Sequence, residues 1–153
     1  MNVLFVCSGN TCRSPMAEAL LRRAVHERGW DDVTVGSAGT GALEGAPASE
    51  GSYLVSLEAG LDLSRHRARQ LTPRLIRDAD VILTMSRSHR SRVEGMGGEG
   101  KTHLLTRYAA DEEGPIEVQD PFGAGLDVYR GTFDQLELLV ANVVRRLAQE
   151  REE

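Results

Sequence analysis

The sequence predicts an α/β fold: a single-domain three-layer α/β/α structure with a four-stranded parallel sheet. Two features indicate it. Strand-type and helix-type segments alternate along the chain, which favours parallel strands with helices on both faces. The expected strands are short runs of apolar residues rather than polar–apolar alternations, as expected for strands buried on both faces. The length of 153 residues suits one domain over residues 1–153, and 41% hydrophobic and 27% charged residues are typical of a globular protein.

In the first half, helix signals separate two expected strands. Pro15 suits a first turn, the apolar residues that follow it share one helix face, and Gly29 suits the end of that helix. The expected elements are strand 2–6, helix 15–29, strand 33–35, a loop of small residues over 37–48, and helix 49–60.

The second half gives the clearest central strand, the apolar run 81–85. The segment 111–128 has no hydrophobic period and contains two prolines, which indicates a long loop of the kind that often carries function. The expected elements are a short helix beginning at Pro73, strand 81–85, helix 86–94, a glycine-rich break over 94–100, strand 102–105, loop 111–128 and an amphipathic helix over 133–147.

The first strand ends in a nucleophile, followed by a short loop and a helix start. Cys7 closes the apolar run, and Arg13 stands six positions later. A loop of this length can wrap its backbone N–H groups around an oxyanion such as phosphate, and the following helix N-terminus attracts the same anion. That field favours the thiolate form of a cysteine at the start of the loop. Arg13 adds a planar fork for two oxygens, so the segment predicts phosphoryl transfer to sulfur.

The residues between them support this reading. Gly9 and Asn10 tolerate left-handed backbone, and Ser14 suits a helix cap before Pro15. In parallel sheets, ligands bind beyond the carboxyl ends of the strands, where Cys7 stands. The plain alternative is an inert, buried cysteine before an ordinary turn. The residues expected to hold the substrate are Ser8, Gly9, Asn10, Thr11, Cys12 and Ser14.

The segment 7–15 resembles the active-site signature of the low-molecular-weight protein tyrosine phosphatases. Further matches follow in the family's order at 37–40, 66–71, 79–85 and 120–122. The resemblance implies a phosphatase that forms a cysteinyl-phosphate on Cys7, with Arg13 stabilising the transferred group. This chemistry needs no metal and no cofactor, and no His/Cys/Asp cluster in the sequence has the spacing of metal ligands.

The resemblance also assigns the remaining roles. It implies that Asp120 is the general acid, although Asp-Pro on its own is a common turn dipeptide. It implies that Asn10, Ser14, Ser37 and His66 support the loop through hydrogen bonds, and that Ser14 also bonds the thiolate. Simpler readings are a helix cap for Ser14 and a surface histidine for His66.

Cys12 stands five positions after Cys7. It could be a small buried loop residue. We expect instead a redox role, in which oxidised Cys7 closes a disulfide with Cys12 and escapes irreversible oxidation.

Thr11 departs from the commonest family pattern, which has an aliphatic residue there. Gly123 stands where an aromatic pair often continues after the Asp-Pro. Both changes weaken the case for a phosphotyrosine pocket. Together with 16–18 and 120–123 they resemble the family's bacterial protein-arginine phosphatases, so we expect phosphoarginine proteins as substrates. The alternative is a plain tyrosine phosphatase.

Two other functions remain as alternatives. A thioredoxin-coupled arsenate reductase shares this fold and loop, but its electron relay uses cysteines well downstream, and this chain has none after Cys12. A module that only binds phosphorylated ligands would need neither Cys7 nor Asp120.

Charge and composition limit the partners. A net charge of −5 gives no support for nucleic-acid binding. No apolar run approaches the roughly 20 residues that span a bilayer, so we expect no membrane contact. Met1 and Asn2 lead directly into the first strand, which leaves no room for a signal peptide, and two cysteines are too few for a secreted disulfide framework. We therefore expect a cytoplasmic protein, with phosphorylated proteins as substrates and inorganic phosphate or other oxyanions as inhibitors.

Overall fold

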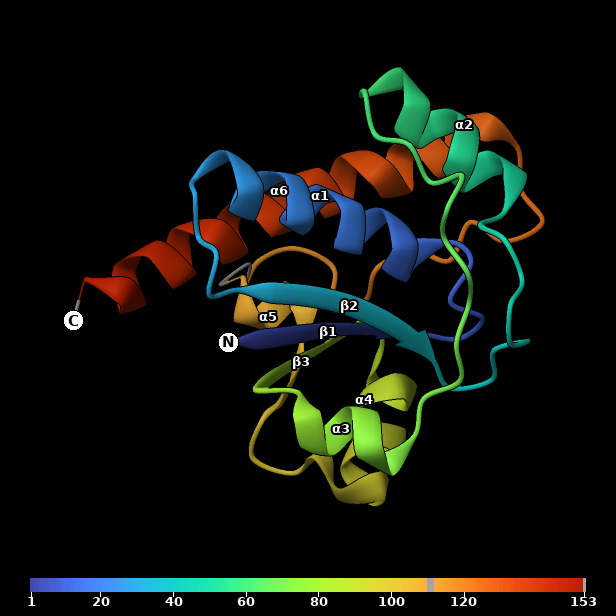
Figure 1. The fold of residues 1–153 in the computed structure, drawn as a ribbon. Coiled ribbons are helices and arrows are strands. Elements are labelled where there is room, and N and C mark those ends of the chain that lie inside the picture. Colours follow the sequence, from blue (N-terminus) through green and yellow to red (C-terminus); the bar gives the residue numbers. More distant parts are fainter. Residues whose placement is uncertain (110–111, 153) are drawn as a thin grey trace.

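The computed structural model describes residues 1–109 and 112–152. Its centre is a four-stranded parallel sheet in the order β2-β1-β3-β4 (Figure 1). The strands are β1 (Asn2–Cys7), β2 (Thr34–Gly39), β3 (Val81–Thr84) and β4 (Thr102–Leu104). The predicted fold class is confirmed.

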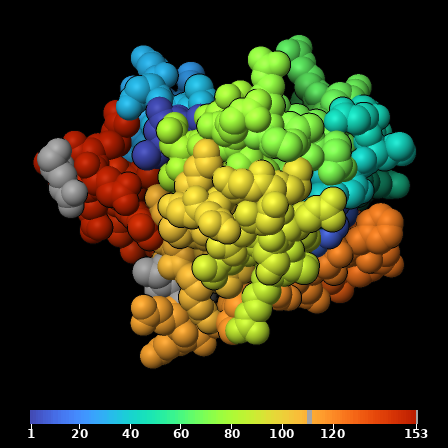
Figure 2. Space-filling model, turned by 90° about the horizontal axis from the view of Figure 1, so that it is seen from below, coloured from blue at the N-terminus to red at the C-terminus, as the bar shows by residue number. Residues whose placement is uncertain are grey.

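Helices cover both faces of the sheet. The helical elements are α1 (Arg13–Glu27), α2 (Glu50–Glu58), α3 (Pro73–Asp78), α4 (Arg87–Val93), the π-helical turn η1 (Glu94–Gly98), α5 (Leu105–Tyr108) and α6 (Leu126–Arg151). Helices α1, α2 and α6 form the upper layer in Figure 1, and α3 and α4 lie below the sheet. Figure 2 views the lower face, where the green to yellow segment conceals most of the blue β1.

Strand β1 is buried on both faces because its residues alternate between two cores. Val3 and Phe5 join the core beneath α1 and α6, whereas Leu4 and Val6 join the core with residues of α3 and α4. Each of these four side chains is at most 3% exposed, and burial of such a side chain contributes about 1.5–3 kcal/mol. This explains why the strand is apolar at every one of these positions.

The strand order places a ligand site at the end of β1. The connection from β1 through α1 runs to β2, while the connection from β3 through α4 runs the other way, to β4. The two helices lie on opposite faces (Figure 1). A crevice opens at such a switch point beyond the carboxyl ends of the two strands. Cys7 is the last residue of β1 and stands at this crevice.

Two elements are longer than predicted. Strand β2 extends to Gly39, because each of its six residues pairs with one residue of β1, small residues included. Helix α6 begins at Leu126 rather than at 133, although Gly131 lowers the helix propensity there. Tyr129 and Thr132 on this first part are buried, so packing outweighs propensity.

Smaller differences occur elsewhere. The expected break at 94–100 contains η1, with a left-handed glycine at Gly97. The expected strand 102–105 ends one residue early, because α5 begins at Leu105. Asp111, where the long loop was expected to begin, lies outside the described residues. Within the described part of the chain, no helix is both long enough and apolar enough to cross a membrane.

Candidate active site

The loop 8–12 joins β1 to α1 and buries the Cys7 thiol. Cys7 is 2% exposed, and its Sγ lies 2.9 Å from the hydroxyl oxygen of Ser14. The prediction that Ser14 caps the helix is wrong. Helix α1 already begins at Arg13, its cap residue is Cys12, and its start has no side-chain cap. The Ser14 hydroxyl contacts the sulfur instead.

Asn10 holds the loop from inside. It is fully buried and has a left-handed backbone, with φ of 57°. Its Oδ1 accepts a 2.9 Å hydrogen bond from the backbone N–H of Arg69. Its Nδ2 donates to the hydroxyls of Ser14 and Ser37, each at 2.8 Å. The polar side chain is therefore well satisfied, as burial requires.

These bonds determine which group the Ser14 hydroxyl donates its proton to. The Arg69 N–H can only donate, so the Asn10 atom facing it is the oxygen and the amide nitrogen faces the two serines. Ser14 therefore accepts from Asn10, and its own proton is free to point at the Cys7 sulfur. Ser37 also accepts from Asn10 and donates to Glu18 at 2.5 Å. A hydrogen bond donated to sulfur stabilises its negative charge.

Two further contacts fix the loop backbone. His66 donates from Nε2 to the carbonyl of Asn10 at 2.6 Å. Gly39, at the end of β2, lies so close to the loop that a Cβ there would come within 2.4 Å of the Ser8 carbonyl oxygen. The sequence matches at 37–40 and 66–71 thus correspond to residues that touch the loop.

Arg13 is buried beneath the loop, with 5% of its surface exposed. Its Nη1 donates to the Val118 carbonyl at 3.1 Å, and its Nη2 lies 3.6 Å from a carboxylate oxygen of Asp120. Its Nε is buried and has no partner among the described residues. A buried donor without a partner is costly, so the site provides a place for an acceptor.

Asp120 and Arg13 meet at a cavity of about 250 Å³. Asp120 is half-exposed, and its Oδ1 accepts a 3.1 Å hydrogen bond from the N–H of Phe122. The cavity is lined by Cys7, Ser8, Gly9, Thr11, Cys12, Arg13, Gly41, Asp120 and Phe122. The structure therefore brings the three expected catalytic residues to one cavity. Asn10, Ser14, Ser37 and His66 are not among the residues that line this cavity.

Two hydroxyl groups, each near the start of another helix, contact the Cys12 thiol. Its Sγ lies 3.3 Å from the hydroxyl of Ser49 and 3.4 Å from that of Tyr129. Burial is the main cause that raises the pKa of Tyr129, so this phenol stays protonated. Tyr129 packs flat against Gly51, where a Cβ would come within 2.5 Å of the ring. Neither of these two partners of Cys12 was expected from the sequence.

His89 also reaches the loop, which the sequence analysis missed. Its Nε2 lies 2.8 Å from the Ser8 hydroxyl, and its Nδ1 lies 2.8 Å from the hydroxyl of Ser86. Burial, together with the nearby charge of Arg13, lowers the pKa of His89 to about 4, so the imidazole is neutral at pH 7. A signal was present: His89 closely follows the carboxyl end of β3, the neighbour of β1.

The buried histidine predicts a pH dependence of stability. In the unfolded chain, His89 takes up a proton below about pH 6.5; in the folded protein, it does so only below about pH 4. The unfolded state therefore binds more protons in this window, and stability falls as the pH falls from 6.5 to 4. We expect His89 to account for about 1–2 kcal/mol of the loss between pH 7 and pH 4.5, after allowance for solvent screening.

Denaturant unfolding at both pH values measures this effect. His89→Gln should flatten the pH dependence, because glutamine does not titrate. The same substitution at the exposed His26 is the matched control and should leave it unchanged. An equal pH dependence in wild type and His89→Gln would contradict the assignment.

Among residues 1–109 and 112–152, no group of three His, Cys, Asp or Glu side chains is placed to hold a metal ion. What the cavity offers is a buried thiol, an unpaired guanidinium nitrogen and a carboxylate. This set can bind an oxyanion and transfer its central atom to sulfur.

Comparison with known proteins agrees with this chemistry. The family model for low molecular weight phosphotyrosine protein phosphatase matches residues 2–153. The protein-arginine-phosphatase of Bacillus subtilis strain 168 is 36% identical over 153 residues, which covers 99% of each chain. The solved structure of a YwlE arginine phosphatase mutant with a phosphorylated active-site serine is 35% identical, with a TM-score of 0.90 and 99% coverage of each chain.

A tyrosine phosphatase is similar as well. The structure of Wzb from Escherichia coli K30 in complex with sulphate is 30% identical, has a TM-score of 0.85, and covers 95% of this chain and 97% of its own. The match of the family model to nearly the whole chain, with relatives above 30% identity, settles the family. The chain belongs to the low molecular weight phosphotyrosine protein phosphatase family and is a cysteine-dependent phosphatase.

Proposed function

We propose that this protein removes phosphate from phosphoarginine residues of proteins, with Cys7 as nucleophile, Arg13 as phosphate ligand and Asp120 as general acid. The observation that carries the assignment of roles is the cavity itself. It combines a thiol that receives a hydrogen bond from Ser14 with a buried Arg13 Nε that lacks a partner among the described residues.

The reaction proceeds in two displacements. The Cys7 thiolate attacks phosphorus, the S–P bond forms and the P–N bond breaks, while Asp120 gives its proton to the leaving guanidinium nitrogen. A water molecule then attacks the cysteinyl-phosphate and gives a proton to Asp120. The S–P bond breaks, releasing phosphate and restoring the thiolate. Arg13 and the backbone N–H groups of residues 8–12 hold the phosphoryl oxygens throughout.

Support for phosphoarginine comes from Thr11 and from the relatives. Thr11 is half-buried and lines the cavity, so it offers a hydroxyl where an aliphatic side chain could only pack. A guanidinium group is polar and gains from such a partner. The Bacillus subtilis relative carries the name protein-arginine-phosphatase.

A tyrosine phosphatase is the second candidate, and one observation favours it. Phe122 is 75% exposed and lines the cavity, so one aromatic wall remains beside a bound ring. Gly123, which follows it, has φ of 81° and bears no side chain to form a second wall. An aromatic substrate would therefore gain apolar contact on one side only.

Substrate preference is tested on matched peptides. We expect kcat/KM to be higher on phosphoarginine than on phosphotyrosine peptides of the same sequence. Thr11→Ile should shift the ratio toward phosphotyrosine by about 1–3 kcal/mol, the usual effect of a small change in pocket polarity. Thr34→Ile, on the edge strand β2 and away from the cavity, is the matched control. If the wild type prefers phosphotyrosine, or Thr11→Ile leaves the ratio unchanged, the tyrosine phosphatase is the better assignment.

We also propose that Cys12 protects Cys7 from irreversible oxidation. Both cysteines are free, and both line the same cavity. Peroxide converts the Cys7 thiolate to a sulfenic acid. The Cys12 thiol then attacks the sulfenic sulfur, which forms the disulfide and releases water.

This role predicts reversible inactivation. Peroxide should inactivate the wild type, dithiothreitol should restore it, and mass spectrometry should show a link between Cys7 and Cys12. In Cys12→Ser, the same treatment should leave Cys7 as a sulfinic or sulfonic acid that dithiothreitol does not reduce. Serine can still hydrogen-bond to Ser49 and Tyr129, so the variant tests the sulfur rather than the packing. Full recovery of the variant would rule the protective role out.

Location and inhibitors follow from the same site. We place the protein in the cytoplasm, because a reducing compartment keeps a catalytic thiol in its active form. We expect inorganic phosphate and other oxyanions to compete with the substrate, as the sulphate bound by the Escherichia coli relative suggests.

A further inference from the structure

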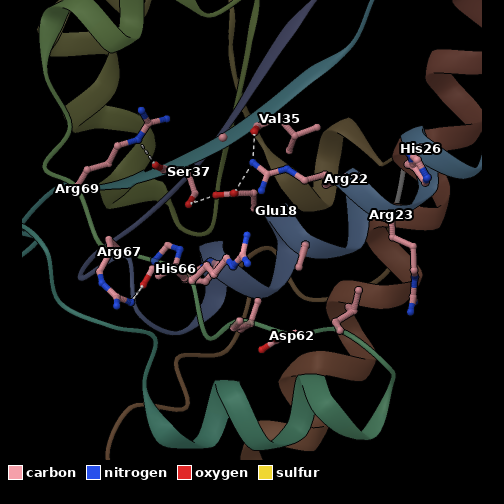
Figure 3. Close-up of a pocket in the computed structure, with 16 residues that line it drawn as sticks. Glu18, Arg22, Arg23, His26, Val35, Ser37, Asp62, His66, Arg67 and Arg69 are labelled. Atoms are coloured by element: carbon pink, nitrogen blue, oxygen red, sulfur yellow. Dashed lines mark hydrogen bonds and ion pairs between the residues drawn. The ribbon is translucent and has the colours of Figure 1, made fainter. Parts of the chain in front are cut away.

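A second cavity, larger than the first, lies on the other side of the catalytic loop. It measures about 790 Å³ and is formed by one side of α1, part of β2 and the segment 61–69 (Figure 3). It shares no lining residue with the cavity at Cys7. The reaction proposed above makes no use of it.

The lining of this cavity is strongly basic. It contains five arginines, at positions 22, 23, 65, 67 and 69, against two carboxylates, Glu18 and Asp62. The excess is three positive charges on one cavity of a protein whose net charge is −5. Such a concentration of one sign raises the local concentration of ions of the opposite sign.

Three of the five guanidinium groups bond backbone carbonyls rather than a carboxylate, while hydrogen bonds from Ser64, together with the charge of Arg65, lower the pKa of Asp62. Arg23 donates to the Ala59 carbonyl, Arg67 to the carbonyls of Ser64 and His66, and Arg69 to the Ser37 carbonyl. Backbone carbonyls orient a guanidinium group without cancelling its charge. Within the described residues, the one ion pair among these arginines joins Arg22 to Glu18. The other side chains keep N–H groups for a further acceptor.

We propose that this cavity binds a small polyanion, such as a compound with two or more linked phosphate groups, and that the bound anion acts on the catalytic loop through Glu18. Its volume lies within the usual range of about 300–1,000 Å³ for small-molecule sites. Guanidinium forks bind phosphate oxygens in pairs, and a compound with several linked phosphates can bond several of these arginines at once.

The path to the loop consists of contacts already described. Arg22 holds Glu18 at 2.6 Å, and Glu18 accepts from Ser37 at 2.5 Å (Figure 3). Ser37 in turn accepts from Asn10, which orients Ser14 toward the Cys7 sulfur. An anion that draws Arg22 away from Glu18 removes the group that fixes this carboxylate. The Ser37–Asn10 contact then loses its support, and turnover slows.

Binding is tested by isothermal titration with inorganic tripolyphosphate. The wild type should show two sites, because this probe also enters the cavity at Cys7. Arg13→Ala should keep the site in the basic cavity. Arg65→Glu/Arg67→Glu should weaken that site by about tenfold or more, since two attractive charges become repulsive. Both arginines are exposed, so the fold should tolerate the change.

The matched control reverses the same charge on the other face. Arg77 and Arg92 are exposed on α3 and α4, and Arg77→Glu/Arg92→Glu should change the affinity by less than about threefold at moderate salt. Equal losses in both double variants, or a single site in the wild type, would overturn the proposal. So would binding of a hexaglutamate peptide without binding of tripolyphosphate, which would indicate a docking surface for acidic proteins.

Coupling is tested by the effect on kcat at saturating substrate. Tripolyphosphate should lower the kcat of the wild type, because its effect through Glu18 does not compete with substrate. It should leave the kcat of Arg65→Glu/Arg67→Glu unchanged. If saturating substrate restores the full rate of the wild type, the anion acts only at Cys7, and the link through Glu18 is refuted.

Discussion

Cys7→Ser is expected to abolish turnover while phosphate binding remains. In the proposed mechanism, Arg13 and the loop backbone bind the phosphoryl oxygens, and the substitution leaves both in place. What the substitution removes is the thiolate, which is the nucleophile of the first step and the leaving group of the second. Thiolate sulfur is a far better nucleophile and leaving group than the oxygen of a serine hydroxyl, and the Ser14 hydroxyl lies 2.9 Å from the sulfur it would stabilise.

Phosphate affinity, measured by titration, and turnover of a phosphopeptide separate these effects. The variant should bind phosphate within about threefold of the wild type, because Arg13 and the loop N–H groups that are proposed to hold the oxygens are unchanged. A mock purification controls for contaminating phosphatases. Turnover by the variant above that background would overturn the assignment of Cys7 as nucleophile.

The sequence was most informative where one short segment carries both structure and chemistry. The apolar run ending in Cys7 predicted the central strand, because a strand buried on both faces must be apolar at successive positions. The position of the site followed from parallel topology alone, since the carboxyl ends of parallel strands share one edge of the sheet. Arg13 and Asp120 both line the cavity that this edge supports.

Prediction failed for elements whose bounds depend on contacts between segments distant in the sequence. Strand β2 includes Gly36 and Gly39, which suggest a loop, but Gly39 must lack a side chain for the catalytic loop to pack against it. The start of α6 has weak helix propensity and is helical because Tyr129 is buried and reaches Cys12. Propensity and periodicity describe local preferences and contain neither constraint.

The polar network behind the loop was only partly foreseen. The resemblance implied that Ser14 supports the loop and bonds the thiolate, and its hydroxyl does lie beside the Cys7 sulfur and accept from Asn10. The simpler reading of Ser14 as a helix cap is wrong, because Cys12 is the cap residue. Glu18 and His89 were missed, because each acts through a contact with a residue far away in the sequence. Such partners become visible only when the fold brings their elements together.

Asp120→Asn is expected to slow turnover by about 10²–10⁴-fold when the leaving group needs a proton. The substitution keeps the shape of the side chain, and the asparagine oxygen can still accept the hydrogen bond from the Phe122 N–H. The loop conformation should therefore persist. What is lost is the proton that Asp120 gives to the leaving atom and later takes back from water.

The size of the loss should depend on the leaving group. In a series of aryl phosphates, phenols of high acidity leave as anions and need little help, so their rates should fall least. Phosphoarginine should suffer most, because its leaving nitrogen must be protonated as the P–N bond breaks. Single-turnover kinetics across the series measure the dependence directly.

Asp127→Asn is the matched control, because Asp127 follows in the same region, is 99% exposed and lies outside the cavity. Equal losses across the series would mean that Asp120 shapes the loop rather than transferring a proton.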